Sequence, residues 1–136
     1  MRTLKIHGVL AVCWLIAGCG SRVNEQVVIE ATHPLLLRQG KYLLFDQHPV
    51  TAVIVEHFAN GRLARSSEFE NGLQQGITRT WYDDGSVESE RTYQQGEKNG
   101  VHYGWWPNGN KQYEYHFTNG AYDGFFKEWY ENGKPL

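Results

Sequence analysis

Glycine and aromatic residues recur with a 24-residue period along most of the chain, and this period limits the folds that the sequence can adopt. The columns with this spacing are Gly61/Gly85/Gly109/Gly133, Gly72/Gly96/Gly120, Gly76/Gly100/Gly124, Trp81/Trp105/Trp129 and Phe69/Tyr93/Phe117. A unit of this size is a single supersecondary motif that cannot bury a core alone, so neighbouring units must stack on one another. The period therefore predicts a repeat array.

Each unit has the pattern of two strands joined by tight turns. In the stretch 112–117, polar residues at even positions alternate with aromatic residues at odd positions, as in a strand with one polar and one aromatic face. Asn-Gly or Asp-Gly pairs between strands adopt positive φ at little cost, as primed hairpin turns require. The sequence predicts an all-β fold, an elongated twisted antiparallel meander of hairpin repeats, with turns at Gly61, Gly72, Gly85, Gly96, Gly109, Gly120 and Gly133.

The repeat domain is expected to span residues 27–136, with a degenerate first unit at 41–61 and clearer units at 62–85, 86–109 and 110–133. The degenerate unit lacks the repeat glycines, whose positions are occupied by Leu37, His48 and Ala52.

The start of this domain is less regular. Residues 27–31 are expected to be a first edge strand, whereas residues 35–37 are compatible with a capping helical turn or with a strand. Some end cap is expected, because a repeat array must cover its terminal hydrophobic face.

Residues 1–18 have the pattern of a secretory signal peptide. Arg2 and Lys5 precede an apolar stretch from Gly8 to Ile16, which is shorter than the ~20 residues of a membrane-spanning helix. Ile16-Ala17-Gly18-Cys19 resembles a bacterial lipobox, which implies cleavage before Cys19 and acylation of its thiol. An ordinary secretory peptide and a buried apolar strand are the alternatives.

If Cys19 is lipidated, residues 19–26 form a short polar tether that holds the domain close to a membrane. By analogy with sorting in Gram-negative bacteria, Gly20 after the cysteine implies the outer membrane, with the domain on its periplasmic side.

The charge balance argues against a nucleic-acid partner. The chain has 13 Lys and Arg against 15 Asp and Glu, and removal of residues 1–18 takes away Arg2 and Lys5, leaving 13 − 2 = 11 bases and a net charge of 11 − 15 = −4. No run of Lys and Arg offers a basic patch, and a mildly acidic protein binds nucleic acid poorly.

No pattern in the sequence indicates catalysis. The histidines lack His-x-His or His-x₃-His spacing, which disfavours a metal site, and no nucleophile motif occurs. Glu88 and Glu90 share a strand face, but an exposed strand lacks the pocket that acid–base catalysis needs. We therefore expect no enzyme activity, no catalytic residue, no metal and no cofactor.

The units resemble the MORN-repeat variant (membrane occupation and recognition nexus) of bacterial proteins. That pattern is a glycine, an aromatic pair, a turn and an alternating strand that ends in an aromatic residue. It is carried here by Gly76, Trp81, Tyr82, Gly85, Tyr93 and Gly96, and by their counterparts in the following unit. The resemblance spans roughly residues 41–136 and implies an elongated meander with stacked aromatics on its concave side. Bacterial proteins of this kind include lipoproteins and a group labelled YwqK-type antitoxins.

Aromatic residues are the candidate binding residues. Neighbouring residues of a strand face opposite sides, so the pairs Trp105-Trp106 and Phe125-Phe126 must each place one ring on a second surface. Exposed Trp and Tyr are favoured as binding anchors. The binding candidates are Trp105, Trp106, Tyr113, Tyr115, Phe126, Trp129 and Tyr130.

The function expected from these features is a membrane-anchored, non-catalytic protein-interaction module whose partner is another envelope protein. One alternative is an antitoxin-like or immunity-like neutraliser of a toxin or effector. Another is the binding of glycan or peptidoglycan through exposed Trp and Tyr.

Overall fold

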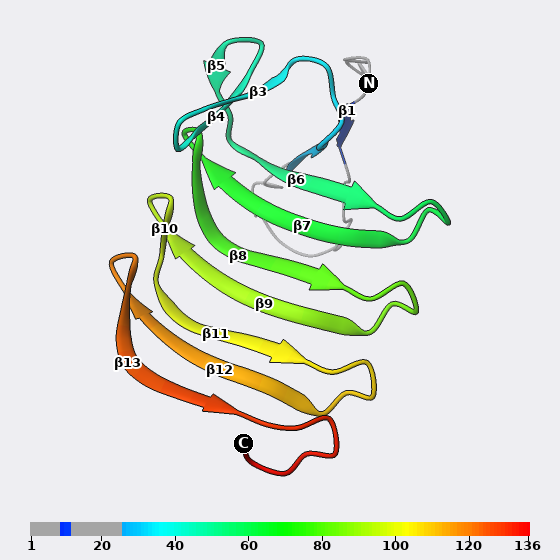
Figure 1. Ribbon diagram of the computed structural model, residues 1–136. Coiled ribbons are helices and arrows are strands. Elements are labelled where there is room, and N and C mark those ends of the chain that lie inside the picture. Colours follow the sequence, from blue (N-terminus) through cyan, green and yellow to red (C-terminus); the bar gives the residue numbers. More distant parts are fainter. Residues whose placement is uncertain (1–8, 12–25) are drawn as a thin grey trace, which may run out of the picture.

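The computed structural model describes residues 9–11 and 26–136, and every regular element in these residues is a β-strand (Figure 1). A large sheet has the strand order β1-β2-β6-β7-β8-β9-β11-β12-β13, with β10 also paired to β9, and a small sheet contains β3, β4 and β5. The large sheet contains β1 (Val9–Ala11), β2 (Val27–Glu30), β6 (Ala52–His57), β7 (Leu63–Glu70), β8 (Leu73–Trp81), β9 (Val87–Gln94), β10 (Glu97–Lys98), β11 (Gly100–Trp105), β12 (Lys111–Thr118) and β13 (Ala121–Glu128). The small sheet contains β3 (Leu36–Gln39), β4 (Tyr42–Phe45) and β5 (His48–Pro49).

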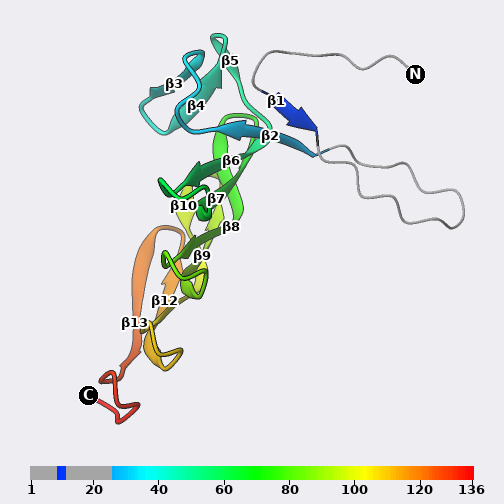
Figure 2. The same cartoon turned by 90° about the vertical axis from the view of Figure 1, so that its right-hand side faces the viewer.

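From β6 to β13 the chain runs as an open antiparallel meander, which confirms the all-β repeat fold predicted from the 24-residue period. The hairpins follow one another down an elongated, curved ladder, and Figure 2 shows its narrow profile with the small sheet at the N-terminal end.

The two ends of the hairpins use different turns. At Asn71-Gly72 both residues have positive φ (51° and 80°), as in a primed two-residue turn, and the equivalent pairs one and two repeats later do the same. At the other end only the glycine is positive, for example Gly85 at 92°, and its amide donates to the carbonyl of Tyr82 at 2.9 Å. A primed turn was the wrong expectation for this end. The strands there are joined by a three-residue loop that closes with a glycine bulge.

Hydrogen bonds between successive units explain the strict period. The turns lie along two margins of the large sheet, one at each end of its strands. On the margin that holds the Gly85 turn, the Tyr82 hydroxyl donates to the carbonyl of Trp105 at 2.8 Å, and the Trp106 indole donates to the carbonyl of Trp129 at 3.1 Å. Each donor is thus bonded 23 residues ahead. The aromatic residue that follows the repeat Trp therefore ties one turn to the next.

The other margin carries a second series of bonds. The amide of each turn glycine donates to a carbonyl of the preceding unit, in the pairs Gly72–Val50, Gly96–Gln74 and Gly120–Lys98. Because both margins repeat, the spacing of the turns is set by the neighbouring unit as well as by the hairpin itself.

The hydrophobic core lies at the N-terminal end, where the small sheet packs against the large one. Its buried residues are Ile29, Leu43, Val50, Ala52, Ile54 and Phe69. The Leu43 amide donates to the carbonyl of Gly72 at 2.7 Å, and a Cβ at Gly72 would lie 3.0 Å from the Leu43 oxygen. The small sheet is thus the end cap of the array. Leu36 and Leu37 belong to strand β3, so the alternative of a helical turn was wrong.

Strand β2 departs from the expected edge position. It pairs in parallel with β6, through Val28 and Val53, and antiparallel with β1, through Ile29 and Val9. The parallel pair arises because the chain leaves the large sheet to build the cap and re-enters it as β6 (Figure 1).

Val9–Ala11 forms strand β1 inside the segment that the sequence assigns to a signal peptide. Cys19, the rest of that segment and the tether up to residue 25 lie outside the described residues. Lipidation of Cys19 therefore stays a prediction.

Candidate functional site

The two faces of the large sheet differ in chemistry. We call the face covered by the small sheet the cap-side face, and the other the outer face. Strand pairing shows which residues share the cap-side face. Thr78 lies opposite Ser67 and Arg91, and further along the same face His102 lies opposite Tyr115. It begins apolar beneath the cap, becomes polar across β7 to β9, and becomes aromatic on β12 and β13.

An aromatic patch occupies the C-terminal half of the cap-side face. Its members are Tyr113, Tyr115, Phe117, Tyr122 and Phe126. Tyr113 and Tyr115 stack with their ring centres 4.7 Å apart, and Tyr122 lies 6.3 Å from Phe126. Tyr122 is 47% exposed and Phe126 is 57% exposed, so this patch reaches solvent near the end of the array.

Tyr115 and His102 are among the groups of this face whose pKa values are shifted. The Tyr115 hydroxyl donates to the carboxylate of Glu128, and this bond, with burial second, raises the pKa of Tyr115 to about 12. His102 is 2% exposed and has Phe117 at 4.6 Å, and its burial lowers the pKa of the imidazole. The ring nitrogen Nε2 lies 2.9 Å from the carbonyl of Thr92, which partly opposes that shift.

The aromatic residues expected to bind a partner do not form one cluster. Tyr113, Tyr115 and Phe126 lie in the patch. Trp105 is on the outer face, where it pairs with Lys111. The Lys111 ammonium lies 5.4 Å from the centre of the Trp129 ring. Two others lie at the turns: Trp106 is half-buried and bonded to the next unit, and Tyr130 is 54% exposed. Tyr122 belongs to the patch but was not among the expected residues.

Strand β13 forms the far edge of the ladder. Among the described residues it pairs along its length with β12, and a single bridge from Trp129 to Pro135 lies on its other side. The Leu136 amide donates to the carbonyl of Glu128 at 2.9 Å, so the backbone N–H and C=O of Glu128 point away from β12. Since backbone groups alternate along a strand, those of Phe126 also point away from β12 and face the open edge.

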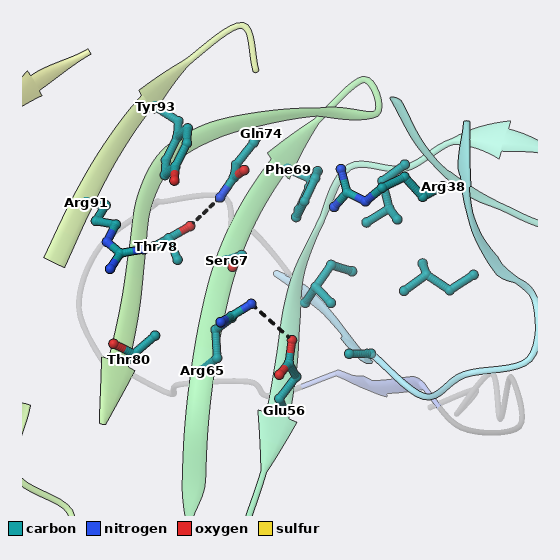
Figure 3. Close-up of a pocket in the computed structure, with 14 residues that line it drawn as sticks. Arg38, Glu56, Arg65, Ser67, Phe69, Gln74, Thr78, Thr80, Arg91 and Tyr93 are labelled. Carbon is teal, nitrogen blue, oxygen red and sulfur yellow. Dashed lines mark hydrogen bonds and ion pairs between the residues drawn. The ribbon is translucent and has the colours of Figure 1, made fainter. Parts of the chain in front are cut away.

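A polar cleft opens on the cap-side face between the cap and the aromatic patch (Figure 3). Its volume is about 380 Å³. Arg38 lines it from the cap, Arg65 from β7 and Arg91 from β9, with Glu56 as the acidic member. Ser67, Thr78 and Thr80 lie between these charged groups.

This basic cleft was missed in the sequence because no run of Lys and Arg encodes it. Strand register brings the arginines together from three distant segments. The repeat alignment does carry a signal: one and two repeats before Tyr113 stand Ser89 and Arg65, and the corresponding residues before Tyr115 are Arg91 and Ser67. Small or basic residues thus replace two aromatic columns in the middle of the array.

Within residues 9–11 and 26–136, no group of three or more His, Cys, Asp or Glu side chains is placed to hold a metal ion. No helix of the described chain is long and apolar enough to cross a membrane.

These features define a protein built from stacked β-hairpin repeats with an N-terminal cap. Residues 74–95 and 98–119 match the family model of the MORN repeat variant, and the second match starts one full repeat after the first. They correspond to the hairpins β8–β9 and β11–β12. No curated protein and no solved structure matches the chain. MORN repeats indicate a repeat-based binding module, and domains of this type are generally non-catalytic.

Proposed function

We propose that the protein is a lipid-anchored, non-catalytic interaction module of a bacterial cell envelope, which docks a partner protein on β13 and the aromatic patch. The observation that carries this proposal is that exposed aromatic rings gather on and beside β13, whose outer edge pairs with no further strand of the described residues. Tyr122, Phe125 and Phe126 on β13, and Tyr130 just after it, are all at least 43% exposed.

Strand addition is the mode of docking that this edge supports. The outward backbone groups of Phe126 offer hydrogen bonds to an added strand, and side chains on both faces supply specificity. Exposed aromatic side chains are also frequent binding hot spots, because they bury large apolar areas with little loss of side-chain entropy.

The proposed anchor is the acylated Cys19. Each buried acyl CH₂ contributes about 0.8 kcal/mol, so two or three chains are enough for stable membrane attachment. The net charge of −4 expected after cleavage (11 − 15) supports attachment through lipid, since an acidic domain gains little from anionic head groups. A Cys19→Ser variant should move from the membrane fraction to the soluble fraction, and unchanged fractionation would contradict the anchor.

The docking edge is tested with two substitutions at one position. Phe126→Ala removes the ring and keeps the outward N–H, whereas Phe126→Pro also removes the N–H without breaking a bond to β12. In cross-linking and pull-down from envelope fractions, we expect Phe126→Ala to reduce recovery of a wild-type partner severalfold and Phe126→Pro to abolish it.

Tyr42→Ala is the matched control, because Tyr42 is also an exposed aromatic residue, 43% exposed, but lies on the cap. It should retain the partner. Equal recovery with wild type and Phe126→Pro would rule out docking at this edge.

A further inference from the structure

The polar cleft carries an excess of positive charge in a protein that is acidic overall. Three arginines and one glutamate line it, whereas the whole chain has a net charge of −2. Arg65 forms an ion pair with Glu56 at 3.6 Å. Arg91 donates to the hydroxyl of Tyr113 at 3.3 Å, and within the described residues neither Arg91 nor Arg38 forms an ion pair with a carboxylate.

The charges are spread along the cleft, not gathered at one point. In Figure 3 Arg91 and Arg38 lie on opposite sides, with Ser67 and Phe69 between them. Arg65 on β7 lies two strands away from Arg91 on β9, and the two residues are also offset by two positions along the strands. Standard strand spacings then put their Cα atoms about 12 Å from each other. This arrangement suits an extended ligand with several anionic groups better than a single small anion.

The floor of the cleft is made of small hydroxyl side chains. Ser67, Thr78 and Thr80 are between 7% and 9% exposed, and two repeats later the rings of Tyr115 and Phe126 stand at the positions of Ser67 and Thr78. Thr78 Oγ1 accepts a hydrogen bond from the Gln74 amide at 2.6 Å, which leaves its own proton available for a ligand. The floor therefore offers polar contacts between the charged walls.

We propose that this cleft binds an extended acidic peptide segment of a partner protein, with its carboxylates on Arg38, Arg65 and Arg91. Guanidinium groups match carboxylates in planar, two-point geometry. In an extended peptide, side chains on one side repeat about every 6.7 Å, so carboxylates four residues apart span the distance between Arg65 and Arg91. The inference deepens the proposed interaction function by naming the chemistry of the partner.

An acidic peptide fits the cleft better than an acidic polysaccharide. Sugars bind to exposed flat ring faces, whereas Phe69 in the cleft is only 6% exposed and Tyr93 packs against His102 with 5.7 Å between ring centres. The lining supplies charges and hydroxyls without an open ring on which a sugar can stack.

The test is a titration of the full chain with octaglutamate, followed by calorimetry at low and moderate salt. Octaglutamine of the same length is the neutral probe, and a galacturonate oligomer is the acidic sugar probe. We expect binding of octaglutamate that weakens with salt, no binding of octaglutamine, and about tenfold weaker binding for Arg38→Gln and for Arg91→Gln.

Arg79→Gln is the matched control, because Arg79 is paired with Glu90 at 2.6 Å on the outer face. It should bind octaglutamate like wild type, and far-ultraviolet circular dichroism should show that all the variants remain folded. Equal weakening by Arg79→Gln and Arg91→Gln would overturn the proposed cleft, as would equal binding of octaglutamine or binding of the galacturonate oligomer alone.

The octaglutamate titration tests the cleft independently of the pull-down that tests docking at β13. Phe126→Pro should bind octaglutamate normally, whereas Arg91→Gln should leave the unpaired edge intact. Loss of partner recovery with Phe126→Pro, together with no octaglutamate binding to wild type, would retain the interaction function and reject the acidic peptide.

Discussion

His102 is a single residue whose ionisation is coupled to folding. Its burial lowers the pKa of the imidazole below the ordinary value of 6.5, so the unfolded chain binds the proton more readily than the folded chain does. The contribution of neutral His102 to stability is therefore complete above pH 6.5 and is lost as the pH falls through the lower, folded-state pKa. Urea unfolding of wild type should show a falling free energy over that acidic range.

His102→Phe isolates this contribution. Phenylalanine stands one repeat later in the same column, as Phe126, so this substitution places a ring that already occurs at this repeat position. The Thr92 carbonyl keeps its bond from the Asn99 amide at 3.1 Å in the variant. The free energy of unfolding should fall less steeply with acid in His102→Phe than in wild type. Parallel curves for the two proteins would show that His102 does not titrate with unfolding.

Among the elements, the turns on the Trp106 margin stabilise the array beyond their own hairpins. Trp106→Phe keeps a ring but removes the indole donor to the Trp129 carbonyl, so the free energy of unfolding should fall by about 1 kcal/mol. Tyr130→Phe is the control in the same repeat column. Its side chain is 54% exposed at the end of the array, and the change should stay within about 0.5 kcal/mol. Equal urea midpoints for the two variants would contradict a stabilising role for the Trp106 bond.

The same elements show how far the sequence determines the fold. The hairpins were predictable because column spacing and alternation are local patterns that every unit repeats. Turn type was not, because an Asn-Gly or Asp-Gly pair suits both a primed turn and a three-residue loop with a glycine bulge. The pairing of β2 with β6 depends on contacts across the whole cap, which no repeat encodes. The cleft could not be predicted for a similar reason, since strand register alone brings Arg38, Arg65 and Arg91 together.

At the scale of the whole molecule, stability should be graded along the ladder. The buried apolar core lies at the capped end, and all eight residues of β13 are exposed or only partly buried. Because each unit of a repeat array contacts only its neighbours, local opening depends on nearby packing. Amide hydrogen exchange should therefore be slowest in β6 to β8 and fastest in β13, where alternate amides also face the open edge.

A core substitution distinguishes graded stability from a single cooperative unit. Leu43 is 5% exposed at the centre of the capped end, so Leu43→Ala should cost about 2–5 kcal/mol there. If neighbouring units are coupled only pairwise, exchange should accelerate strongly in β6 to β8 while the rates in β12 and β13 hardly change. An equal acceleration in every strand would mean that the array opens as a whole. In that case, a ligand bound in the cleft would stabilise the distant edge as much as the cap.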